Sequence, residues 1–93
     1  MMQLKVEFLG LARELAGVSA CLATLAAGAT WRDLICDLAS QFPALVGPVI
    51  LPDSCTLSTA YMLNVNGRTI VRDFDEPVQT GQRLLLMFAE AGG

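Results

Sequence analysis

The feature that most limits how this chain can fold is a single amphipathic helix, predicted between Thr30 and Phe42, among segments typical of strands. Thr30 is a preferred N-cap residue, and Asp33 follows in the first turn. Apolar residues then recur at helical spacing: Trp31, Leu34, Ile35, Leu38, Ala39 and Phe42. Pro43 disfavours a helical conformation in the residue before it, so the helix should end there. One helix can cover only one face of a sheet, which predicts an α+β fold.

The N-terminal third predicts two paired strands. Apolar and polar residues alternate over residues 4–8 and again over residues 21–25, as in strands with one buried face. Between them, Leu11 to Ala16 fits a short helix that Gly17 would end. We expect the two strands to run antiparallel.

The second half begins with an aperiodic segment and continues with a hairpin. Leu45 to Ser58 contains glycine and prolines, which indicates a loop with at most a turn of helix. Tyr61 to Val65 alternates, Asn66-Gly67 suits the two positive-φ positions of a tight turn, and Arg68 to Arg72 forms the predicted returning arm.

The final predicted strand, Arg83 to Phe88, is apolar on both faces. One face carries Leu84, Leu86 and Phe88, and the other carries Leu85 and Met87. This pattern is typical of a strand in the middle of a sheet. If the helix covers one face, the other is a candidate docking surface, and Leu84, Leu86 and Phe88 are the candidate partner-binding residues. The alternative is that the loop over residues 45–58 closes the second face.

The chain ends on Gly92 and Gly93, and the five residues from Ala89 to Gly93 reach at most about 17 Å beyond the strand. Glycine lets another surface approach the backbone closely, so such a tail could enter a narrow enzymatic channel. The alternative is a frayed end without a function. We expect one domain over residues 1–93, with residues 89–93 as a flexible tail.

Composition excludes several functions. The net charge is −3 and the six cationic residues are scattered, which argues against nucleic-acid binding. No apolar signal core follows a basic start, and no stretch is apolar enough to span a membrane, so we expect a cytoplasmic protein. Cys21, Cys36 and Cys55 lack CxxC spacing and the chain has no histidine, so we expect no metal site and ordinary buried thiols.

Several segments together resemble the MoaD/ThiS family of sulfur carriers, which have the β-grasp fold of ubiquitin-like proteins. Phe8 to Gly17 is similar to the phenylalanine-to-RELxG segment of the small subunit of molybdopterin synthase. Residues 75–81 resemble the D-x-P-L-x-D-G turn before that family's last strand. Residues 28–30, 64–67 and 92–93 also match in relative position. The prolines that many of these carriers have before the tail are absent from residues 87–91. The resemblance implies a mixed sheet of four to five strands with one main helix on one face.

The resemblance to this family also implies a function for the C-terminal tail. An E1-like enzyme would use ATP to adenylate Gly93, a persulfide donor would supply sulfur, and the product would be a C-terminal thiocarboxylate. With Gly92 as its slender neighbour, Gly93 would enter the large catalytic subunit of molybdopterin synthase and donate sulfur for the molybdenum or tungsten cofactor. The chain would bind no cofactor and would be a co-substrate more than a catalyst.

Three alternatives remain open. The chain could be a ubiquitin-like modifier joined through Gly93 to lysines, a thiamine-type sulfur carrier, or an adaptor that binds through its sheet and never uses its tail.

Overall fold

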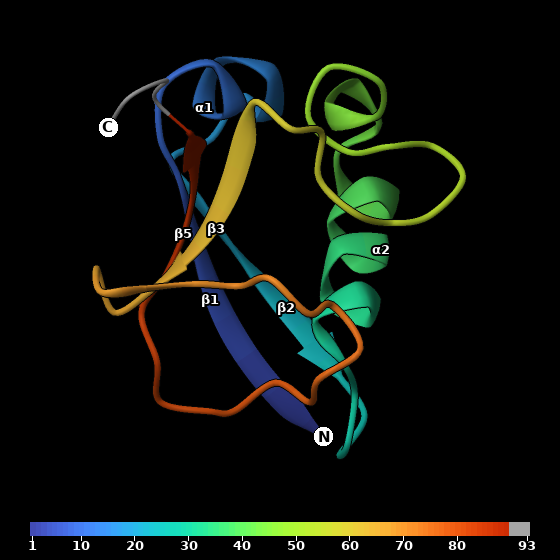
Figure 1. Cartoon of the computed structure of the whole chain (residues 1–93), viewed down its shortest axis with the longest axis vertical. Coiled ribbons are helices and arrows are strands. Elements are labelled where there is room, and N and C mark those ends of the chain that lie inside the picture. Colours follow the sequence, from blue (N-terminus) through green and yellow to red (C-terminus); the bar gives the residue numbers. More distant parts are fainter. Residues whose placement is uncertain (90–93) are drawn as a thin grey trace.

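The computed structural model describes residues 1–89 and places one helix layer against one face of a five-stranded sheet (Figure 1). The predicted tail, apart from Ala89, lies outside the described residues. The elements in chain order are β1 (Met2–Phe8), α1 (Leu11–Ala16), β2 (Ala20–Leu25), α2 (Trp31–Gln41), the 3₁₀ helix η1 (Pro43–Leu45), β3 (Tyr61–Val65), β4 (Thr69–Ile70) and β5 (Leu84–Phe88).

The sheet is mixed, with strand order β2-β1-β5-β3-β4. Strand β1 pairs antiparallel with β2, as predicted, and parallel with β5. Strand β3 pairs antiparallel with both β5 and β4. The last strand therefore lies in the middle of the sheet, as its two apolar faces predicted, and the predicted α+β class with four to five strands is confirmed.

Helix α2 forms where its cap and its periodicity predicted. The backbone N–H of Asp33 donates to Thr30 Oγ1 over 3.3 Å, and the backbone N–H of Thr30 donates to Asp33 Oδ2 over 2.9 Å. This reciprocal capping box satisfies two donors that would otherwise lack partners. The helix buries one apolar stripe against the sheet: Trp31, Leu34, Ile35 and Leu38.

The loop that follows α2 belongs to the same side of the sheet as the helix (Figure 1). Leu45, Val49 and Ile50 are at most 1% exposed and join the core cluster that α2 forms with the sheet. The alternative in which this loop covers the second face is therefore wrong. Within residues 1–89 no helix covers that face, where Leu85 lies outside the core cluster.

The returning arm of the hairpin is shorter than predicted. Asn66 and Gly67 adopt the expected positive φ angles of 58° and 70°, but β4 contains only Thr69 and Ile70. The reason is that the chain then leaves the sheet for the start of α2. There the carbonyl oxygens of Phe74 and Glu76 accept hydrogen bonds from the first backbone N–H groups of the helix.

The prediction of three ordinary buried thiols is wrong for two of the cysteines. Cys36 of α2 and Cys55 of the following loop form a disulfide, with Cα atoms 5.1 Å apart. The loop folds back along the helix and brings together two cysteines that are 19 residues apart in sequence. Cys21 on β2 is the one free cysteine of the described chain.

No helix of residues 1–89 combines the length and the apolar character needed to cross a membrane.

Candidate functional site

Strand β5 ends at Phe88, and Ala89 is the last residue that the structure describes after it. Phe88 pairs with Tyr61 of β3, and their rings pack edge to face with centroids 5.5 Å apart. The backbone N–H of Ala89 donates to the carbonyl oxygen of Ala60 over 2.7 Å. Backbone and side-chain contacts therefore fix the base of the tail at the start of β3.

The other end of β5 is fixed by side chains from two other elements. The backbone N–H of Arg83 donates to Asn66 Oδ1 over 2.8 Å, and Asn66 donates its own backbone N–H to the Arg83 carbonyl. The Arg83 guanidinium pairs with the Glu7 carboxylate at 2.8 Å, and this hydrogen bond lowers the pKa of Glu7. These contacts hold the strand in register, so its last residue has a defined position in the sheet.

The structure divides the three predicted partner-binding residues into two groups. Leu84 and Leu86 are fully buried beneath the helix layer and contribute to the core, so they offer no surface to a partner. Their face is the covered one, because both leucines belong to the same core cluster as the buried stripe of α2. Phe88 follows the same alternation but lies beyond the core, with 49% of its surface exposed.

Two exposed leucines that the sequence reasoning missed lie at the same end of the sheet. Leu9 follows β1 and donates its backbone N–H to the carbonyl oxygen of Leu86 over 3.0 Å. Leu11 begins α1, the short helix beside the end of β5 (Figure 1). Both are at least 39% exposed. The exposure of Leu11 could have been predicted from the sequence, since a helix of six residues is too short to bury apolar residues on every side. We call Leu9, Leu11 and Phe88 the tail-exit surface.

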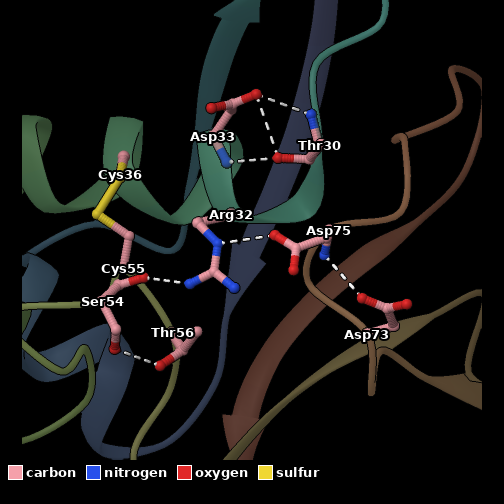
Figure 2. A network of polar contacts seen from close by, with 9 residues as sticks. All are labelled: Thr30, Arg32, Asp33, Cys36, Ser54, Cys55, Thr56, Asp73 and Asp75. Atoms are coloured by element: carbon pink, nitrogen blue, oxygen red, sulfur yellow. Dashed lines mark hydrogen bonds and ion pairs between the residues drawn. A yellow bond between two sulfur atoms is a disulfide. The ribbon is translucent and has the colours of Figure 1, made fainter.

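A polar network joins the start of α2 to the two segments that pack beside it (Figure 2). Arg32 Nε donates to Asp75 Oδ1 over 2.9 Å, and Arg32 Nη1 donates to the Ser54 carbonyl oxygen over 2.6 Å. The hydrogen bond from Arg32 lowers the pKa of Asp75. Since Ser54 is next to Cys55, the hydrogen bond from Arg32 to the Ser54 carbonyl and the disulfide restrain the same loop.

Cys21 is the free thiol of residues 1–89. Burial, with a smaller contribution from Asp37, raises the pKa of the Cys21 thiol to about 11, which keeps it protonated and weakly nucleophilic at neutral pH. Within residues 1–89, no three His, Cys, Asp or Glu side chains gather in a way that could hold a metal ion. The predicted reacting residues, Gly92 and Gly93, lie outside the described residues.

The sheet order, the single helix layer and the central last strand decide the fold. The chain has the β-grasp fold. Among solved structures it is similar to small archaeal modifier protein 1 (SAMP1) of Haloferax volcanii, with 23% identity and a TM-score of 0.81 over 99% of this chain and 100% of that chain. No protein-family model and no curated protein sequence matches it.

Two further solved structures are similar to this chain. A putative molybdopterin converting factor subunit 1 of Pyrococcus furiosus has 25% identity and a TM-score of 0.71, over 95% of this chain and 98% of that chain. A chain of the BexX/CysO complex of Amycolatopsis orientalis has 23% identity and a TM-score of 0.68, over 97% and 99%. The resemblance predicted from the sequence is thus confirmed in the structure.

Proposed function

We propose that this protein is a sulfur carrier whose C-terminal Gly93 is converted to a thiocarboxylate. The observation that carries the proposal is the position of β5. This strand is held between β1 and β3, and its last residue, Phe88, lies five residues before Gly93. Those five residues reach at most about 17 Å, so a partner that binds the tail must also contact the end of the sheet. The likeness to the putative molybdopterin converting factor subunit supports the same function.

The chemistry requires activation because a carboxylate is a poor electrophile. The Gly93 carboxylate would attack the α-phosphorus of ATP on an E1-like enzyme, releasing pyrophosphate and forming an acyl adenylate. A protein persulfide would then attack the carbonyl carbon and expel AMP, leaving an acyl disulfide. A second thiolate would cleave its S–S bond, which releases the thiocarboxylate and a disulfide of the donor. Since ATP drives the first step, we place the carrier in the cytoplasm.

We assign the thiocarboxylate to molybdopterin synthesis, with this chain as the small subunit and a larger catalytic subunit as its partner. In that complex Gly93 donates sulfur to a pterin precursor, and Gly92 keeps the tail narrow. The tail-exit surface docks on the activating enzyme and on the large subunit, since its three apolar side chains are exposed at the end of the sheet where β5 ends. That the BexX/CysO complex contains a chain with this fold supports a protein partner for this chain as well.

The first test is the intact mass of the protein purified from its own host. Replacement of one oxygen by sulfur should add about 16 Da, confined to the C-terminal peptide. Deletion of Gly93, or Gly92→Val, should abolish the added mass while the far-UV spectrum stays unchanged. Thr24→Ala, on an exposed position of β2, is the matched control and should keep it. Sulfur gained by the chain without Gly93 would refute the assignment.

The docking surface is tested separately by binding. Leu9→Glu and Phe88→Glu should weaken the complex with the activating enzyme by at least about tenfold, because each buries a charge against an apolar partner. Leu22→Glu is the control, since Leu22 is 58% exposed on β2, outside the tail-exit surface. Equal losses for all three variants would argue against this surface.

A second candidate function is supported by the likeness to SAMP1, which is named as a modifier protein. In that case the activated Gly93 would form an isopeptide bond with lysines of other proteins. Tryptic peptides from the host would then carry a remnant of this tail on lysine, and the unconjugated protein would retain a plain carboxylate.

A further inference from the structure

The disulfide between Cys36 and Cys55 is the covalent link between α2 and the loop over residues 51–60 (Figure 2). Cys36 is exposed on the outer side of the helix, and Cys55 is half-buried in the loop. The thiolate of another protein can therefore approach the Cys36 sulfur. Exposed disulfides are as a rule the labile ones, whereas structural disulfides are shielded.

The other contacts of the loop are weaker than the disulfide. None of the side chains of residues 51–60 is buried, although Leu57 and Ala60 pack against the core as partly buried residues. The loop is also held by backbone hydrogen bonds, such as Leu51 to Thr56 at 2.8 Å, and by the contact of Arg32 with the Ser54 carbonyl. Cys55 itself has a φ of 51°, a left-handed conformation that is unfavourable for a residue with a Cβ. Breaking the disulfide would remove the strongest restraint and free Cys55 to leave this conformation.

The same loop forms the base of the tail. Its last residue, Ala60, accepts the hydrogen bond of Ala89. Leu57, Ser58 and Thr59 line a shallow hollow of about 390 Å³ that Ala89 also lines. The same short loop therefore carries the disulfide at Cys55 and the hydrogen bond to Ala89 at Ala60. A change in the position of the loop on reduction would also weaken its contact with Ala89.

We propose that Cys36–Cys55 is a redox switch, read by a dithiol protein, that sets how firmly the base of the C-terminal segment is held. One thiolate of the dithiol attacks Cys36 Sγ and forms a mixed disulfide, while the Cys55 thiolate leaves and takes up a proton. The second thiol of the dithiol then displaces Cys36, so that the two cysteines gain two electrons and two protons and the partner becomes a disulfide. Oxidation is the reverse reaction with a partner disulfide.

A reversible role follows in part from the proposed function, because ATP-dependent activation places the protein in the cytoplasm. Reducing compartments keep most thiols reduced, and a disulfide found there is usually transient and regulatory. The oxidised form would hold the tail base closed against β3, and the reduced form would release it.

Hydrogen exchange on the full chain tests the switch without any tail chemistry, so its failure is distinguishable from failure of the sulfur-carrier proposal. Dithiothreitol is the dithiol probe. On reduction, the amides of residues 51–60 and of Ala89 should exchange at least about tenfold faster, while those of β1 stay protected. Cys21→Ser should respond like the parent chain, and Cys36→Ser/Cys55→Ser should exchange quickly with or without the probe.

Two outcomes overturn the proposal. Unchanged exchange at Ala89 would show that the disulfide restrains only the loop and does not influence the base of the tail. Equal acceleration in β1 would show that reduction unfolds the whole domain, which leaves no switch between two folded states.

Discussion

Removing the Cys36–Cys55 disulfide should lower the free energy of unfolding by about 3 kcal/mol. The bridge joins residues 19 apart in sequence, and closing a loop of that length removes roughly 11 cal/mol/K of entropy from the unfolded chain, or about 3 kcal/mol at 25 °C. For a domain of this size the loss corresponds to a melting temperature lower by roughly 12 to 24 °C. A typical domain has 5 to 15 kcal/mol in total, roughly, so the variant should stay folded.

The variant to measure is Cys36→Ser/Cys55→Ser, by urea denaturation without reductant. A second variant, Cys36→Ser/Cys55→Gly, separates the two effects at residue 55. Glycine adopts the left-handed φ of 51° without a Cβ clash, so this variant should be about 1 kcal/mol more stable than the double serine. The parent chain in excess dithiothreitol should match the double serine variant. A loss under about 1 kcal/mol, or a parent chain insensitive to reductant, would refute the reasoning.

Three further predictions concern other parts of the molecule. Leu86→Ala should cost about 2 to 5 kcal/mol in urea denaturation because Leu86 is fully buried, whereas Phe88→Ala should cost clearly less and instead weaken binding to the activating enzyme. Thr30→Ala should cost about 1 kcal/mol, since the capping box loses its side-chain acceptor; an unchanged melting curve would contradict this. Alkylation of Cys21 by iodoacetamide should be slow at pH 8 and rise steeply only toward pH 11, because burial raises the pKa of its thiol to about 11; a rate that levels off near pH 9 would show the thiol to be ordinary.

Features set by neighbouring residues were predictable from the sequence. The Thr30 cap, the apolar stripe of α2 and the Asn66-Gly67 turn each depend on contacts within a few residues, and all three formed as expected. The central place of β5 also followed from its own two apolar faces.

Features that depend on distant contacts were not predictable. Nothing in the aperiodic loop shows that Cys55 returns to α2, so the disulfide was missed. Both faces of β5 are apolar, so alternation alone does not tell which one the helix covers, and Leu84 and Leu86 were assigned to the wrong surface. The length of β4 likewise depends on a distant contact, because the residues that follow it form hydrogen bonds with the N-terminus of α2.

The parallel pairing of β1 with β5 has a consequence for how the protein is made. Val6 pairs with Leu84, so β1, the first strand to be translated, lacks its parallel partner strand until nearly the whole polypeptide has been synthesised. Contacts this far apart in sequence form slowly, and chains still being synthesised cannot make them at all. A chain released before residue 84 would lack the strand that joins the two halves of the sheet. Truncated translation products should therefore remain unfolded and be degraded, and they would not compete with finished molecules for the partner enzymes.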